Sequence, residues 1–140
     1  SFSLLTDDAI ALRALERIGA HLAPGGVAWI PLFVPEPLTA EELGMTRTAV
    51  DERGDEISVS FLSQQRDELA RTQRTLLRYR RVTGGTAEVV DREWELHWHT
   101  REGFAALASR AGLTVAGVLG EDGSPAEPSE TEITVVLSRE

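Results

Sequence analysis

The spacing of hydrophobic positions in the first part of the chain predicts a helix over residues 6–22. Apolar side chains recur there at the spacing of one helical face: Ile10, Leu15, Ile18 and Leu22. Thr6 is expected to cap the first turn, with Asp7 and Asp8 at the positive end of the helix dipole. Proline cannot continue the helical hydrogen bonds, so the helix is expected to end at residues 23–26, Ala-Pro-Gly-Gly.

Residues 27–34 are apolar at every position, which is typical of a strand inside a sheet that is covered on both faces. Such a strand needs layers above and below it. Pro31 has no backbone N–H, which predicts either a bulge or an unpaired side at that position.

After residues 38–45, which are expected to form a loop or short helix, the hydrophobic period changes to two. Four extended segments are predicted, and they suggest an antiparallel meander: residues 46–51, 57–65, 72–82 and 88–99. A helix over residues 66–77 is an open alternative. Residues 100–111 then predict a second helix, capped by Thr100 and ended by Gly112, before strands at 113–119 and 133–137 that flank a loop.

Composition limits the class of protein. The 140 residues are 41% hydrophobic and 26% charged, which is typical of one soluble globular domain. The sequence has no apolar run of about 18 residues and no basic leader, so a cytoplasmic location without membrane contact is expected. The net charge of −9 argues against nucleic acid as a partner. Because cysteine is absent, disulfides, thiolate metal sites and thiol nucleophiles are excluded.

Four short segments carry a family resemblance. They are residues 1–5 (Ser-Phe-Ser-Leu-Leu), 22–26 (Leu-Ala-Pro-Gly-Gly), 111–115 (Ala-Gly-Leu-Thr-Val) and 120–125 (Gly-Glu-Asp-Gly-Ser-Pro). In order and spacing they resemble the C-terminal half of class I S-adenosylmethionine-dependent methyltransferases. The resemblance implies an α/β fold, the C-terminal part of a Rossmann-like sheet. Residues 1–140 would form a single incomplete domain, and residues 38–99 would be an antiparallel meander inserted as a substrate-binding lid.

The same resemblance implies S-adenosyl-L-methionine as the cofactor of the complete protein, with Phe2, Ser3 and Leu4 along the cofactor cleft. The family holds this cofactor with a glycine-rich loop after its first strand and an acidic residue after its second, and neither is found here. The chain alone is therefore expected to bind the cofactor poorly. The first residue is Ser1 and the only methionine is Met45, as expected of a cut product. A complementing N-terminal segment is the expected partner.

The candidate catalytic residues are His97 and His99. In an extended segment they share one face with Glu95, while Trp94, Leu96 and Trp98 share the other. A histidine facing the cleft would accept a proton from a hydroxyl or amine during methyl transfer. The alternative is a solvated sheet face opposite a tryptophan-lined core. A metal site is not predicted, because ligands on one strand lack a third element.

Tyr79, Glu95 and Trp98 are the candidate substrate-binding residues. Tyr79 lies among several arginines of the insertion, which form either a pocket for an acidic substrate or a solvated surface. His21, near the end of the first helix, is expected to be a solvated or capping residue. The leading interpretation is the substrate-side portion of a small-molecule methyltransferase that is inactive without its N-terminal half. The alternative is a non-catalytic ligand-binding or dimerisation module. Such a module could form a homodimer, because unpaired strand edges can pair with the edge of a second chain.

Overall fold

The computed structural model describes residues 1–139, which form two compact units. The first, here called the α/β unit, contains Ser1–Pro35 and the residues from Leu96 onward. The second, here called the meander unit, is Glu36–Glu95. None of the described helices has the length and apolar character that crossing a membrane requires.

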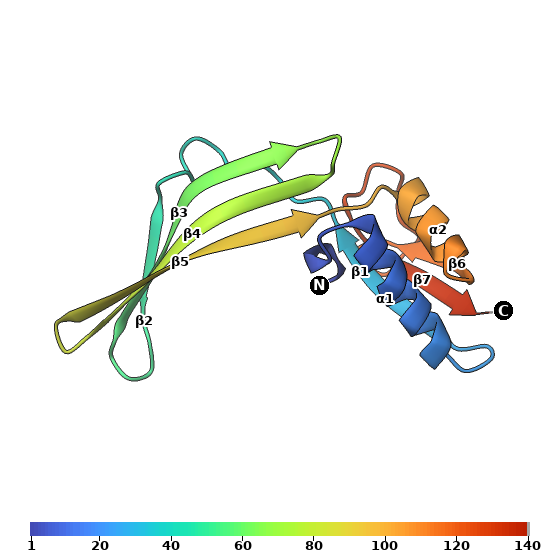
Figure 1. The fold of residues 1–140 in the computed structure, drawn as a ribbon, viewed down its shortest axis with the longest axis horizontal. Helices are drawn as coiled ribbons and strands as arrows, with labels where there is room; N and C mark the ends of the chain where they lie inside the picture. The colour runs from blue at the N-terminus through green and yellow to red at the C-terminus, as the bar shows by residue number, and fades with distance from the viewer. Residues whose placement is uncertain (140) are drawn as a thin grey trace. The chain divides into compact units, whose positions relative to one another are not determined.

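The α/β unit combines two helices with a three-stranded sheet (Figure 1). Its elements are η1 (Phe2–Leu4), α1 (Asp8–His21), β1 (Val27–Phe33), α2 (Arg101–Arg110), β6 (Leu113–Leu119) and β7 (Glu132–Arg139). The strand order is β1-β7-β6, and β7 is antiparallel to both neighbours. β1 and β6 therefore run in the same direction, and the predicted α/β fold is confirmed.

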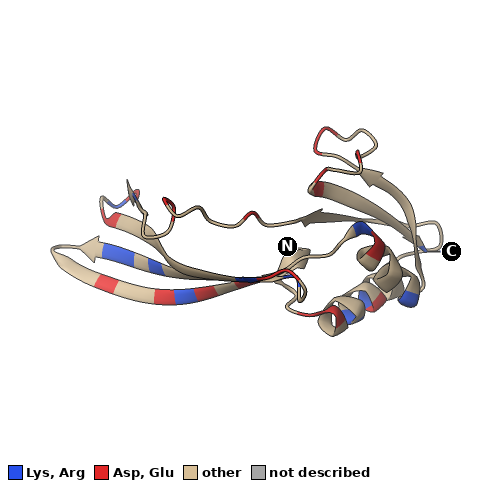
Figure 2. Ribbon diagram, turned by 90° about the horizontal axis from the view of Figure 1, so that it is seen from above, with Lys and Arg blue, Asp and Glu red and all other residues tan. Residues whose placement is uncertain are grey.

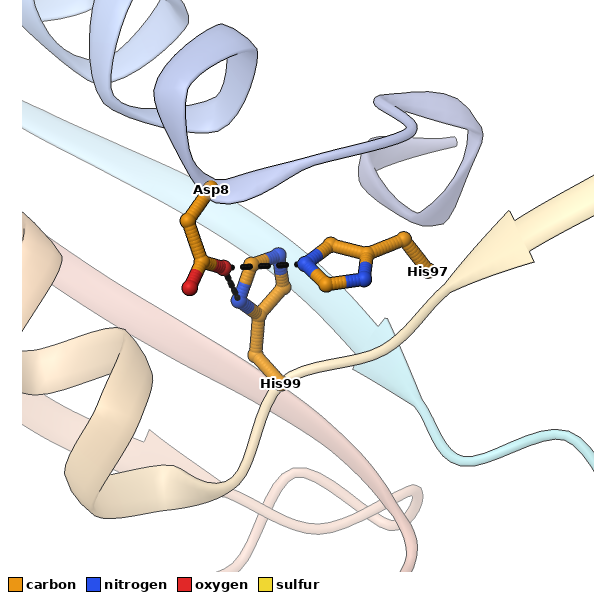
Figure 3. A group of neighbouring side chains, drawn as sticks. All are labelled: Asp8, His97 and His99. Carbon is orange, nitrogen blue, oxygen red and sulfur yellow. Dashed lines mark hydrogen bonds and ion pairs between the residues drawn. The ribbon is translucent and has the colours of Figure 1, made fainter. Parts of the chain in front are cut away.

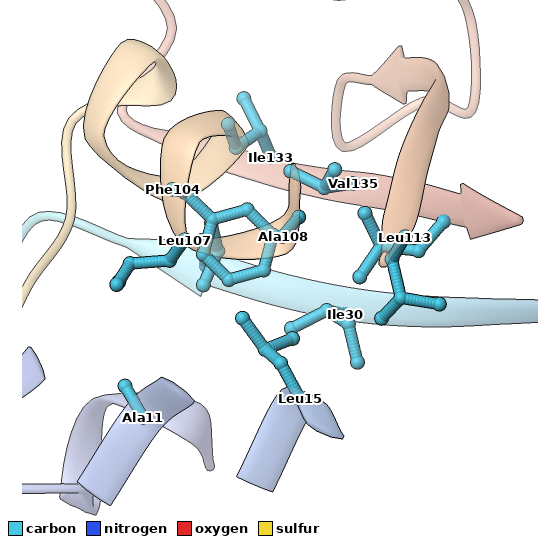
Figure 4. Close-up of a cluster of buried hydrophobic side chains, with 11 residues drawn as sticks. Ala11, Leu15, Ile30, Phe104, Leu107, Ala108, Leu113, Ile133 and Val135 are labelled. Carbon is cyan, nitrogen blue, oxygen red and sulfur yellow. The ribbon is translucent and has the colours of Figure 1, made fainter. Parts of the chain in front are cut away.

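The core of this unit lies between the two helices and one face of the sheet (Figure 4). It consists of Ala11, Leu15, Ile30, Leu32, Phe104, Leu107, Ala108, Leu113, Ile133, Val135 and Leu137. Leu15, Phe104 and Leu137 are completely buried. Burying a side chain of this size contributes about 1.5–3 kcal/mol, so this cluster is the main source of the unit's stability.

Only one face of β1 is covered by the described residues. Ile30 and Leu32 point into the core, whereas Val27 and Trp29 are 51% and 62% exposed. The first layer that the apolar pattern predicted is therefore present, and no described residue supplies the second.

Pro31 occupies the unpaired edge of β1. The backbone N–H of Val34 donates to the carbonyl of Thr131 at 3.0 Å, and the register pairs Pro31 with Thr134 without interruption. Successive residues of a strand turn their N–H groups to opposite sides. The missing N–H of Pro31 therefore falls on the side away from β7, so the unpaired-side interpretation is confirmed and no bulge forms there.

The ends of the helices correct one prediction and confirm two. Asp7, not Thr6, caps α1, because its Oδ1 accepts a hydrogen bond from the N–H of Ile10 at 2.8 Å. Thr100 caps α2 as predicted, accepting from the N–H of Gly103 at 3.0 Å. Gly112 follows α2 with φ of +73°, a left-handed conformation that glycine adopts without steric cost.

The meander unit is a four-stranded antiparallel sheet in the order β2-β3-β4-β5, as predicted. The strands are β2 (Thr46–Val50), β3 (Glu56–Asp67), β4 (Thr72–Thr83) and β5 (Thr86–His97), and the last residues of β5 belong to the α/β unit. The alternative of a helix over residues 66–77 is wrong. Asp67 instead begins a hairpin turn and accepts from the N–H of Ala70 at 2.9 Å.

The two faces of the meander sheet differ in polarity. One face carries ion pairs between neighbouring strands: Arg78–Asp91 at 2.8 Å, Arg74–Glu95 at 3.3 Å and Arg80–Glu56 at 3.1 Å. Figure 2 shows basic and acidic segments interspersed along the strands of the meander unit. The other face, here called the apolar face, carries two apolar cross-strand pairs, Val59 with Tyr79 and Phe61 with Leu77. At one end of this face Arg81 pairs with Asp51 and Asp55. The sheet is therefore amphipathic, and its arginines mainly form a solvated, ion-paired surface.

Candidate functional site

Asp8 meets two histidines that are distant from it in sequence, His97 and His99, in the α/β unit (Figure 3). Asp8 is the first residue of α1, where a carboxylate is favoured by the helix dipole. His97 is the last residue of β5, and His99 directly precedes Thr100, the cap of α2. The end of a strand and the start of two helices thus place the cluster.

One carboxylate oxygen faces both imidazole rings. Asp8 Oδ1 lies 2.9 Å from Nε2 of His97 and 3.6 Å from Nδ1 of His99. The two rings meet edge to face, with their centroids 4.9 Å apart. The three potential ligand atoms all lie within 4.8 Å of one another, so a single small ligand could contact all of them.

Burial separates the two histidines from the aspartate. His97 and His99 are 4% and 6% exposed, whereas the side chain of Asp8 is 47% exposed. The ring of His99 packs against Phe2 at 5.6 Å and Phe104 at 5.9 Å between centroids. The imidazoles are therefore held by core packing, and Asp8 is the side of the cluster open to solvent.

This burial overturns the alternative of a solvated histidine face opposite a tryptophan-lined core. Both histidines are buried, and Trp94 is 52% exposed while Trp98 is 5% exposed. The physical reason is that β5 ends at His97. Strand alternation therefore does not extend through Trp98 and His99, and it does not fix which face is covered.

Two cavities lie at the carboxyl end of β1, and both are lined by Leu32 and Phe33. The larger has a volume of about 390 Å³ and includes Glu121 and Glu132 in its lining. The smaller, of about 260 Å³, is lined by His99 together with Arg101, Glu102 and Glu130. Glutamates outnumber arginines in both linings, which favours ligands that carry an amine or another cation.

His21 is placed as predicted, exposed at the end of α1. Its Nδ1 lies 2.7 Å from the carbonyl oxygen of Arg17, one helical turn earlier. It lies at the opposite end of α1 from Asp8 and contacts the Arg17 carbonyl instead of the Asp8 cluster, which makes it a suitable control residue.

No family model and no curated protein sequence matches this chain. Solved structures do match its fold. The structure of a S-adenosylmethionine-dependent methyltransferase from Clostridium acetobutylicum matches this chain with a TM-score of 0.71 and 14% sequence identity. The match covers 99% of this chain and 55% of the methyltransferase. This chain has about half of a methyltransferase fold.

Two sugar-modifying enzymes have the same fold over a similar length. CalS10, an amino pentose methyltransferase from Micromonospora echinaspora determined with S-adenosylmethionine bound, has a TM-score of 0.66 at 24% identity, over 99% of this chain and 54% of its own. The sugar N-methyltransferase KedS8 from Streptoalloteichus has a TM-score of 0.67 at 20% identity, over 99% and 53%. The predicted resemblance to half of a methyltransferase is confirmed at the level of fold.

The described residues of this chain do not fit a complete cofactor site. Of the predicted cofactor-binding residues, which form η1, Ser3 is 1% exposed and Phe2 packs edge to face against Phe104 at 5.4 Å. Only Leu4, at 52%, has an exposed side chain. Among the described residues the one strand-to-helix connection, from β5 to α2, contains no glycine. A glycine-rich turn that cradles the cofactor is therefore not in this part of the methyltransferase fold.

The predicted substrate-binding residues are not brought together. Tyr79 lies on the apolar face of the meander unit, whereas Glu95 pairs with Arg74 on the charged face. Trp98 is buried in the α/β unit. Their roles stay predictions. Sequence reasoning missed Asp8, and the only signal for it was its place in the first turn of the helix.

Proposed function

We propose that this chain is the acceptor-side portion of a S-adenosylmethionine-dependent methyltransferase that acts on a small molecule. The observation that carries the proposal is the fold, which follows methyltransferases over 99% of the chain but spans only about 55% of theirs. The described residues provide a packed α/β unit with cavities at the carboxyl end of β1, and their one strand-to-helix connection contains no glycine. The chain's activity therefore depends on an N-terminal half that binds the cofactor.

The acceptor class that the cavities favour is a small amine, such as an amino sugar. Glu121 and Glu132 line the larger cavity, and Glu102 lines the smaller one. Carboxylates attract the protonated form of an amine in solution and orient it. Two methyltransferases of similar fold are named as acting on an amino pentose and on a sugar nitrogen.

Within this function, His99 is the candidate for the group that receives the acceptor's proton. It lines the smaller cavity, and Asp8 lies beside it and beside His97. The cofactor, when bound in the complete protein, supplies an electrophilic methyl group. The chain's own part is to hold the acceptor, keep water from it and take its proton on a neutral imidazole. We further propose Tyr79, Glu95 and Trp98 as candidate substrate-binding residues.

The test is a methyl-transfer assay on this chain with and without the segment encoded upstream of Ser1. Mass spectrometry of an amino-sugar acceptor is expected to show methylation only with the longer form. In that form His99→Gln is expected to slow transfer about 100-fold or more, whereas His21→Gln has no effect. Methylation by the shorter chain alone, or full activity of His99→Gln, would overturn this assignment.

The amphipathic meander sheet favours a second candidate, a non-catalytic binding or dimerisation module. Its apolar face exposes Tyr79 and, on β5, Val90 and Trp94, at 37%, 42% and 52%. Exposed aromatic surface of this kind is typical of interfaces. A stable dimer in sedimentation, together with no cofactor binding and no methylation by the longer form, would favour this candidate over the enzyme.

A further inference from the structure

We propose that Asp8, His97 and His99 bind one divalent transition-metal ion of the zinc class. Two imidazole nitrogens and a carboxylate oxygen are ligands that zinc commonly takes in proteins. The three come from separate elements, the start of α1, the end of β5 and the residue before the cap of α2. This supplies the third element that the sequence pattern on one strand lacked.

The two distances from the Asp8 carboxylate oxygen to the imidazole nitrogens suit a single ion. Zinc bonds of about 2.0–2.2 Å to nitrogen and oxygen place neighbouring ligand atoms about 3.3 Å apart in a tetrahedral arrangement. The observed separations from Asp8 Oδ1, 2.9 Å to His97 Nε2 and 3.6 Å to His99 Nδ1, lie on either side of that value. Small rotations of the side chains would complete the coordination.

The surroundings hold the ligands and leave a way in. Both imidazoles are buried, and the ring of His99 is fixed between Phe2 and Phe104. Asp8 is about half exposed, so an ion can enter from solvent and keep a fourth position for water. The positive end of the α1 dipole opposes a cation, but it amounts to about half a charge, which the full negative charge of Asp8 exceeds.

Metal binding has a consequence that rests on the proposed function. An ion bonded to His97 Nε2 and His99 Nδ1 takes a nitrogen lone pair of the His99 ring, which is the ring that would receive the acceptor's proton. Zinc is therefore expected to inhibit methyl transfer by the longer form, and a chelator is expected to restore it. The binding itself requires neither the cofactor nor an acceptor.

The test is a calorimetric titration of the 140-residue chain with Zn²⁺, repeated with Co²⁺ and followed by visible absorption. One ion per chain is expected, with cobalt bands that report nitrogen and oxygen ligands. Asp8→Asn is expected to weaken binding by at least about 10-fold, and His97→Gln likewise. His21→Gln is the matched control, because it removes an exposed histidine outside the cluster.

Asp8→Asn decides the result, because Asp8 is half exposed and circular dichroism can check that its fold is kept. Absence of saturable binding, or equal affinity in Asp8→Asn and the parent chain, overturns the proposal. The two proposals fail separately. If zinc binds but the longer form transfers no methyl group, the metal site stands and the proposed function is wrong. If the longer form transfers methyl groups but zinc does not bind, the proposed function stands and the metal site is wrong.

Discussion

The two units of the chain are stabilised by different kinds of interaction. The α/β unit buries a cluster of eleven apolar residues, whereas Leu77 is the one buried apolar residue of the meander unit. The meander unit relies on backbone ladders and on ion pairs such as Arg78–Asp91, whose side chains are 47% and 40% exposed. Exposed ion pairs contribute only about 0–1 kcal/mol each. A single substitution is therefore expected to lower the free energy of unfolding more in the α/β unit than in the meander unit.

This difference also separates the roles that the two units can have. The packed α/β unit holds Asp8, His97 and His99 at defined distances, as a site for proton or metal chemistry requires. The meander unit leaves an apolar face with Tyr79 exposed, which suits contact with an acceptor or a partner.

The largest effect is expected from Phe104→Ala in the α/β core. Phe104 is completely buried, so its truncation is expected to lower the free energy of unfolding by about 3–5 kcal/mol. Val89→Ala is the control in the meander unit, where the residue is 52% exposed and the loss should stay within about 0.5 kcal/mol. Chemical denaturation measures both values, and equal losses would contradict the contrast between the units.

A smaller effect is expected at the start of α1. Asp7→Ala removes the observed cap and is expected to cost about 1 kcal/mol. Thr6→Ala removes the cap that the sequence favoured and should change stability by less than about 0.5 kcal/mol. If thermal unfolding showed the opposite order, the cap would belong to Thr6 and the observed helix start would be wrong.

The smallest effect concerns the ion-paired face of the meander unit. The hydrogen bond from Arg78 holds the pKa of Asp91 below its ordinary value of 3.8. Because the folded-state pKa is the lower one, the pair stabilises the fold above pH 3.8 and this contribution is lost as the pH falls through the folded-state pKa.

An NMR titration checks this. Arg78→Gln is expected to return the pKa of Asp91 toward 3.8, and added salt is expected to act in the same direction because the pair is exposed. Arg80→Gln is the matched control, since Arg80 pairs with Glu56 instead. An unchanged Asp91 pKa in Arg78→Gln would show that the Arg78–Asp91 ion pair does not form in solution.

Most of the secondary structure could be predicted because local pattern determines it. The change from helical to alternating period located the meander, and Thr100 and Gly112 marked the ends of α2. The pattern failed where neighbouring residues offer the same chemistry. Thr6 and Asp7 can both cap a helix, and only the backbone path decides that Asp7 does.

The site was only half predictable for a different reason. Alternation grouped His97 with His99, but it gave no information on what packs against them. Their partner Asp8 is 89 residues away from His97 in sequence, and a contact of that range arises only when α1 and the end of β5 come together in the fold. The same limit applies to Trp98, which is buried because the chain has left the strand by then.

The central claim is that this chain carries the acceptor side of a methyltransferase and not its cofactor site. A calorimetric titration with S-adenosylmethionine tests this division most directly. The chain alone is expected to give no saturable heat, and the form that includes the segment encoded upstream of Ser1 is expected to bind one cofactor per chain. Saturable, one-to-one binding by residues 1–140 alone would contradict it.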